Sequence, residues 1–114
     1  MTHTMKLKEE YYNYIKNGTK RYEIRLNDEK RQKIKKGDFI EFQKEPLLKE
    51  KMTIKVDDIL HYNSFSELIN DIKIEYLADA SIKKEKLKED LEFFYPIEKQ
   101  KLYGVVAIKL EKNI

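Results

Sequence analysis

The 114-residue chain contains no cysteine, so disulfide bonds, thiolate zinc sites and cysteine nucleophiles are excluded. It also lacks tryptophan, and its two histidines, His3 and His61, lie too far apart in sequence to suggest a zinc centre. No apolar run approaches the roughly 20 residues of a membrane span, and residues 1–8 lack the apolar stretch of a signal peptide. We therefore expect a cytoplasmic protein, away from membranes, with no metal and no cofactor.

Glycine and proline are also scarce, with three and two residues, which argues against a disordered tail. Charged residues make up 39% of the chain, against about 25% in typical domains. Hydrophobic residues still reach 40% and aromatic residues 11%. A chain of this length corresponds to one ordinary domain. Residues 1–114 are thus predicted to form a single domain with a small core under a highly charged surface.

The formal net charge of +3 is unevenly distributed along the chain. Residues 6–36 carry eleven basic and five acidic side chains, so this segment is +6 and the remainder is −3. All three arginines, Arg21, Arg25 and Arg31, lie within it. The planar guanidinium group suits recognition of phosphate and carboxylate. This clustering favours an anion-binding site, and the alternative is a solvated, lysine-rich surface.

Hydrophobic periodicity predicts an α+β fold in which helices interrupt the strands without regular alternation. The predicted strands are residues 3–7, 22–26, 39–42, 52–60 and 102–110, and the last is apolar enough to be central and buried on both faces. The predicted helices are residues 8–16, 67–72 and 82–94, with a short turn at 29–34, while residues 73–81 are ambiguous. We expect a small curved or barrel-like sheet of about five strands with flanking helices.

Individual residues indicate which side of the predicted helices is buried and where these helices end. Leu7, Tyr11 and Ile15 recur every four residues and predict an apolar stripe that places Tyr11 in the core. Gly18 follows the first helix and is predicted to end it in the left-handed conformation. Pro96 is predicted to end the helix of residues 82–94, in which Phe94 belongs to the apolar side.

The strand of residues 22–26 alternates between an apolar and a charged face. The preceding turn is predicted to expose Lys20, and the strand then places Glu23 and Arg25 two residues apart on the charged face. A carboxylate between two cations is a candidate site for binding or acid–base chemistry. A solvated strand face is the alternative explanation for the same alternation.

Gly18, Lys20, Glu23 and Arg25 together form Gly-x-Lys-x-x-Glu-x-Arg, which resembles the signature of the ASCH domain family, a PUA-like fold. The stretches of residues 34–42 and 103–108 resemble the strand entry and the closing strand of the same family, so the resemblance covers nearly the whole chain. It implies a small bacterial single-domain member with a β-barrel. Helices would lie beside a cleft lined by the motif's Lys20, Glu23 and Arg25.

PUA-like domains commonly bind RNA, so the resemblance implies binding of single-stranded RNA or a nucleotide-like ligand in a basic cleft. Basic side chains would contact phosphates and tyrosines would stack on bases. Ser64 could contribute a hydroxyl, although a helix cap is the alternative role for it. The candidate ligand-binding residues are Gly18, Lys30, Arg31, Tyr62, Ser64 and Tyr95.

An alternative is a metal-free hydrolase acting on RNA or a modified nucleoside, with Lys20, Glu23 and Arg25 as the catalytic residues. Glu23 would be the base, and the two cations would stabilise the phosphate. One ASCH branch resembles an amidohydrolase that deacetylates N4-acetylcytidine. Lys20 matches its motif lysine, but Glu23 stands where that branch has threonine, so the hydroxyl is missing. A second alternative is a non-catalytic regulatory or interaction domain, with the charged helix of residues 82–94 as its partner surface.

Overall fold

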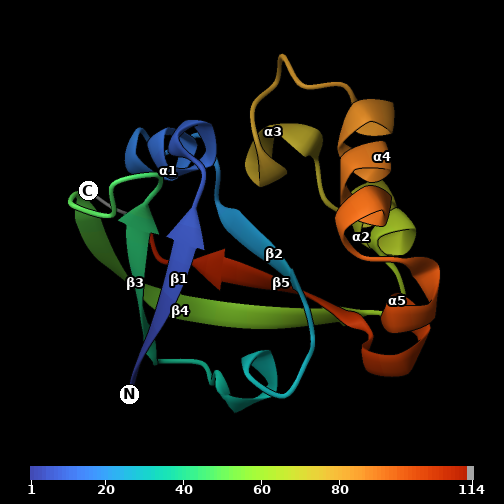
Figure 1. Cartoon of the computed structure of the whole chain (residues 1–114), viewed down its shortest axis with the longest axis horizontal. Helices are drawn as coiled ribbons and strands as arrows, with labels where there is room; N and C mark the ends of the chain where they lie inside the picture. Colours follow the sequence, from blue (N-terminus) through green and yellow to red (C-terminus); the bar gives the residue numbers. More distant parts are fainter. Residues whose placement is uncertain (113–114) are drawn as a thin grey trace.

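The sheet is mixed and strongly curved (Figure 1). The computed structural model describes residues 1–112, and its five strands are Thr2–Leu7 (β1), Tyr22–Leu26 (β2), Phe39–Lys44 (β3), Lys51–Tyr62 (β4) and Val105–Leu110 (β5). They are ordered β1-β3-β4-β5-β2, with β1 parallel to β3 and the other three pairs antiparallel. The predicted α+β class, with about five strands in a curved sheet, is confirmed.

Strand β4 is responsible for the curvature. Its first half pairs with β3 and its second half with β5, and the register shifts between Val56 and Asp58. Such a bulge bends a strand and increases its twist. As a result β1 and β3 run steeply across β4 and β5 (Figure 1), and β1 and β2 become the two edges of a half-barrel.

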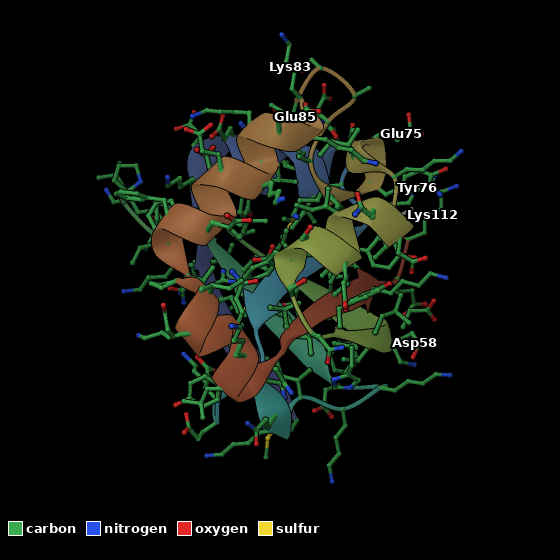
Figure 2. The ribbon with its side chains drawn as sticks, turned by 90° about the vertical axis from the view of Figure 1, so that its right-hand side faces the viewer. Asp58, Glu75, Tyr76, Lys83, Glu85 and Lys112 are labelled. Atoms are coloured by element: carbon green, nitrogen blue, oxygen red, sulfur yellow. The ribbon has the colours of Figure 1, made fainter. Side chains whose placement is uncertain are left out.

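The helices lie at two places around this sheet. Residues 1–112 contain α-helices Glu9–Lys16 (α1), Phe65–Asp71 (α2), Ile74–Leu77 (α3), Lys84–Phe94 (α4) and Ile97–Tyr103 (α5), and a 3-10 turn at Arg31–Lys33 (η1). Helix α1 lies beside β1 and β3, whereas α2 to α5 gather at the other end of the sheet (Figure 1). Figure 2 views this helical side, with Lys83 and Glu85 reaching outward at the start of α4. None of these helices has the length and apolar composition needed to cross a membrane.

Two apolar clusters form the core, and they contact opposite faces of β5. The first packs α1 against β1, β3 and β4, and the second packs α2, α3 and α4 against β2 and β5. In β5, Val106 and Ile108 belong to the first cluster, and Val105 and Ala107 to the second. The prediction that this strand is buried on both faces is therefore confirmed, and it lies inside the sheet between β4 and the edge strand β2. Full burial of one large apolar side chain stabilises a fold by about 1.5–3 kcal/mol.

The expected apolar stripe of the first helix is shifted by one residue. Helix α1 begins at Glu9, so Leu7 belongs to β1 and cannot set the helical phase. The buried residues of α1 are Tyr12 and Ile15, three positions apart, while Tyr11 is only half-buried. The prediction of Tyr11 as a core residue was therefore wrong, and its side chain is available to line a pocket.

The C-terminal part of the chain contains one more helix than expected. Pro96 separates α4 from α5 and stands at the N-cap of α5, a position that needs no amide donor. Residues 102 and 103 therefore belong to α5, and β5 begins after Gly104, which has φ +72°. Phe94 lies at the end of α4 with 58% of its surface exposed, contrary to the expected apolar face.

Candidate functional site

A pocket of about 260 Å³ opens between the corner of β1 and α1, strand β2 and helix α4. It lies between the two sheet edges, where strand pairing does not close the half-barrel. Arg25 bridges these edges, because its Nη2 donates to the carbonyl of Lys6 at 2.9 Å. The lining combines charged and aromatic side chains, among them Tyr11, Lys20, Glu23, Arg25, Phe94 and Tyr95.

Lys20, Glu23 and Arg25 form one connected group at this pocket. Arg25 donates from Nε to Oε2 of Glu23 at 3.0 Å, and its Nη2 forms an ion pair with the same oxygen at 2.9 Å. Lys20 Nζ lies 3.4 Å from Oε1 of Glu23 and donates to the carbonyl of Leu77 at 2.5 Å. The exposed fractions of the three side chains are 2%, 5% and 17% in sequence order. The expectation that the turn exposes Lys20 was wrong.

Local structure explains why Lys20 is buried. Helix α1 ends through Gly18, which has φ +87° as predicted and donates its amide to the carbonyl of Ile15. The chain then turns back, so that the amide of Lys20 donates to the carbonyl of Tyr14 at 2.9 Å. This return directs the Lys20 side chain into the interior, where its Nζ lies 5.7 Å from the ring centre of Tyr11.

Helix α3 is held over the start of β2 by Arg21. The amide of Arg21 donates to the carbonyl of Tyr76 at 2.7 Å, and its guanidinium lies 4.6 Å from the ring centre of Tyr76. Tyr76 lies on the opposite side of α2 from α4 in Figure 2. Because Leu77 follows Tyr76, this contact also fixes the position of the Leu77 carbonyl, which accepts a hydrogen bond from Lys20. One arginine of the basic segment thus has a positional role.

The electrostatic environment keeps Glu23 ionised. Burial alone would raise the pKa of its carboxyl, but the charges of Arg25 and Lys20 outweigh burial and hold the pKa below its usual value. Burial also lowers the pKa of the Lys20 ammonium, and Glu23 opposes this effect. Burial, reinforced by Glu10 and Asp90, raises the pKa of Tyr11 to about 12, so its phenol remains a proton donor at neutral pH.

The carboxylate of Glu23 is occupied by donors from this chain. Oε1 accepts from the amide of Ile24 at 3.1 Å and faces Lys20, while Oε2 accepts from Nε of Arg25 and is paired with its Nη2. A carboxylate has about four acceptor sites, so Glu23 acts mainly to orient the two cations. The pocket then offers a ligand donors: the third N–H of Lys20, the remaining N–H groups of Arg25 and the phenol of Tyr11.

The pocket as a whole is not strongly basic. Its charged lining consists of four basic and four acidic side chains, which are Lys6, Lys8, Lys20, Arg25, Glu10, Glu23, Glu45 and Asp90. The excess of positive charge in residues 6–36 is therefore not concentrated here. Within residues 1–112, no three His, Asp or Glu side chains gather in an arrangement that can hold a metal ion.

A family comparison gives a clear assignment. The model of the ASCH domain matches residues 5–114. The chain belongs to the ASCH domain family. The motif residues Gly18, Lys20, Glu23 and Arg25 and the closing strand β5 all lie within the matched range.

Two solved structures are similar to this ASCH domain over almost their whole length. The crystal structure of hypothetical protein PH0355 is 40% identical, with a TM-score of 0.87, and the match covers 99% of this chain and 100% of that one. The solution NMR structure of protein PF0455 from Pyrococcus furiosus is 38% identical, with a TM-score of 0.77 and coverages of 98% and 97%. Both are archaeal proteins, so they give no support to the expected bacterial origin. No curated protein matches the chain.

The ASCH domain brings four of the nine candidate site residues together. Lys20, Glu23, Arg25 and Tyr95 line the pocket. The other five lie outside that lining within the described residues, and they are Gly18, Lys30, Arg31, Tyr62 and Ser64.

Each of these five has another position or local partner. Gly18 borders a smaller hollow of about 160 Å³, and Lys30 precedes η1. Arg31 lies 3.5 Å from Asp28. The hydroxyl of Tyr62 donates to Asp71 at 2.6 Å, and the hydroxyl of Ser64 caps α2 by accepting from the amide of Glu67 at 3.2 Å.

Sequence reasoning missed several residues of the lining. Tyr11 was assigned to the core, and Phe94 to the apolar side of α4, yet both line the pocket of this ASCH domain. Lys8 and Asp90 had no distinguishing pattern in a chain so rich in charge. The consecutive aromatics Phe93, Phe94 and Tyr95 before Pro96 were an available signal, because adjacent positions at the end of a helix point in different directions and cannot all face the core.

The pKa of Glu23 gives the first testable prediction. Because its folded pKa lies below the ordinary value of 4.5, its charge stabilises the fold fully above pH 4.5, and this contribution is lost as pH falls through the folded pKa. The free energy of unfolding of the wild type minus that of Glu23→Gln should therefore shrink progressively as the pH falls below 4.5. Urea titrations at fixed pH values measure it. A constant difference below that pH would contradict the assignment.

Proposed function

We propose that this ASCH domain binds single-stranded RNA or a nucleotide-like ligand, and that the pocket receives one base. The observation that carries this proposal is the convergence of Lys20, Arg25 and the aromatic side chains of Tyr11 and Tyr95 on one concavity. Base recognition in single-stranded RNA combines aromatic stacking with hydrogen bonds to base edges. Family membership supports the same class of ligand.

The charge of the pocket favours a base over a phosphate as the occupant. A lining with equal numbers of basic and acidic groups gives little net attraction for a multiply charged anion. The buried donors of Lys20 and Arg25 instead suit neutral acceptors such as base carbonyl oxygens. Phosphates would then lie at the pocket mouth, where the lining residues Lys6 and Lys8 are exposed to solvent.

The structure gives less support to hydrolysis with Glu23 as general base. Its Oε2 accepts from Arg25, its Oε1 accepts from the amide of Ile24 and faces the Lys20 ammonium, and its pKa is lowered. A carboxylate of low pKa whose two oxygens are both engaged by donors or cations is a weak base near neutrality. Binding is therefore the function that this geometry favours.

The binding proposal predicts a large effect of Arg25→Gln. Removal of a charged donor that is mostly buried should weaken binding of a labelled single-stranded RNA by about 10-fold or more. Fluorescence anisotropy at 50 and 200 mM salt measures both the affinity and its salt dependence. Wild-type affinity should fall with salt through counterion release.

Arg31→Gln is the matched control, because it removes the same charge outside the pocket. It should reduce the salt dependence slightly and leave most of the affinity. Equal losses in the two variants would indicate a diffuse electrostatic surface instead of a pocket. If the wild type retains no oligonucleotide in a salt-sensitive way, the proposed function is wrong.

A further inference from the structure

Two adjacent phenylalanines are exposed at the C-terminal end of α4. Phe93 has 82% and Phe94 58% of its surface accessible, although Leu87 and Leu91 already supply the buried face of this helix. Their rings meet edge to face, with centres 5.6 Å apart and planes at 84°. Scattered exposed apolar residues need no explanation, but a paired aromatic surface at the mouth of a pocket does.

Phe94 connects this pair to the pocket. Its ring is part of the pocket lining, as is that of Tyr95, so an aromatic surface continues from the interior to the outside through consecutive residues. Lys8, at the start of α1, places its Nζ 4.9 Å from the ring centre of Phe94. The mouth of the pocket thus combines an aromatic face with an exposed cation from a different element.

We propose that Phe93 and Phe94 form a stacking subsite for the nucleotide that adjoins the base in the pocket, and that Lys8 contacts the phosphate between them. The inference rests on the proposed function and makes it more specific. The preferred ligand becomes a strand of at least two nucleotides instead of a free nucleotide. Proteins that bind single strands combine aromatic side chains, on which successive bases stack, with basic groups that follow the backbone.

Exposed cations beside the pair favour a strand with phosphates over an apolar protein surface, although the lining as a whole is balanced in charge. Lys6 and Lys8 are exposed beside the pocket mouth. Glu92, which precedes Phe93, lies 3.9 Å from Lys88, so part of its repulsion toward a phosphate is offset. An aromatic surface next to exposed cations is complementary to bases joined by phosphates.

The test compares Phe93→Ala with the wild type, using a labelled random-sequence RNA hexamer and a mixture of nucleoside monophosphates as probes. Phe93 lies outside the pocket lining, so the affinity for monophosphates should not change. The affinity for the hexamer should fall by about 5- to 100-fold, the range for loss of one stacked base. Phe93→Tyr retains the ring and should retain the affinity. Phe39→Ala is the matched control, because Phe39 is also exposed but lies on β3 beside Thr2, at the end of β1 away from Lys6.

Each outcome separates this inference from the function on which it rests. Hexamer binding that is insensitive to Phe93→Ala but sensitive to Arg25→Gln would overturn the subsite and leave the proposed function standing. A wild type that binds neither probe would overturn both. Dimerisation by light scattering that Phe93→Ala abolishes, with unchanged hexamer affinity, would identify the pair as a self-association surface and would also overturn the subsite.

Discussion

Replacement of Glu23 by leucine should destabilise the domain by about 3–5 kcal/mol, the usual effect of leaving a buried charge without its partner. Lys20 is 2% exposed, and in the wild type its ammonium faces Glu23 at 3.4 Å. In the variant it would keep the carbonyl of Leu77 as an acceptor but would lose its counter-charge. Chemical denaturation at pH 7 measures the loss, which should appear as a lower midpoint with a similar slope.

The double variant Lys20→Met with Glu23→Leu distinguishes a charge effect from a packing effect. Apolar residues of similar size often replace a buried ion pair at little cost, so the double variant should recover the part of the stability lost in Glu23→Leu that is due to Lys20, while Arg25 still lacks its carboxylate. Recovery of stability should not restore RNA binding, because a pocket donor is absent. If the double variant is as unstable as the sum of the single variants, the pair is not coupled and this account of the site fails.

The second large effect is expected for Gln100→Met. Gln100 is 1% exposed; its Oε1 accepts from the amide of Phe65 at 2.9 Å, and its Nε2 donates to the carbonyl of Tyr95 at 2.8 Å. Methionine has a similar volume but satisfies neither group. Because each unsatisfied buried polar group costs about 1–3 kcal/mol, we expect a loss of about 2–5 kcal/mol, measurable by urea denaturation.

This variant should also affect the pocket, because Gln100 fixes the backbone of Tyr95, and the ring of Phe65 packs 5.4 Å from that of Tyr95. We expect weaker RNA binding even at temperatures where the variant is folded. Lys99→Met, at the adjacent exposed position, is the control and should change stability by less than about 0.5 kcal/mol. A Gln100→Met protein as stable as this control would show that the two hydrogen bonds contribute little.

The strands were the most predictable part of this chain. Each of the five predicted strands overlaps an observed one, because alternation in residues 22–26 and 52–60 and the apolar run near 105–110 are direct consequences of sheet burial. The motif also indicated which residues would converge, since Lys20, Glu23 and Arg25 line one pocket. Local pattern was sufficient for these features.

Other features depend on tertiary contacts that no local pattern encodes. The charge of Lys20 predicted exposure, and only the carbonyl of Leu77, 57 residues away, together with Glu23, makes its burial tolerable. Gln100 lies in a short polar helix, and its role depends on Phe65, 35 residues away. Pro96 was predicted to end the helix of residues 82–94, and α4 does end at Phe94, but the start of α5 directly after Pro96 was not predicted.

The pairing of β2 has a consequence for the order in which the protein is made. Residues 22–26 include Glu23 and Arg25 of the pocket. They pair with residues 105–109, so that Tyr22 lies opposite Lys109. During synthesis, β2 cannot pair with β5 until almost all of the described chain has left the ribosome. Contacts between residues so distant in sequence form slowly. The pocket is therefore among the last parts of the molecule to mature, and a nascent chain that ends before β5 should have no binding activity.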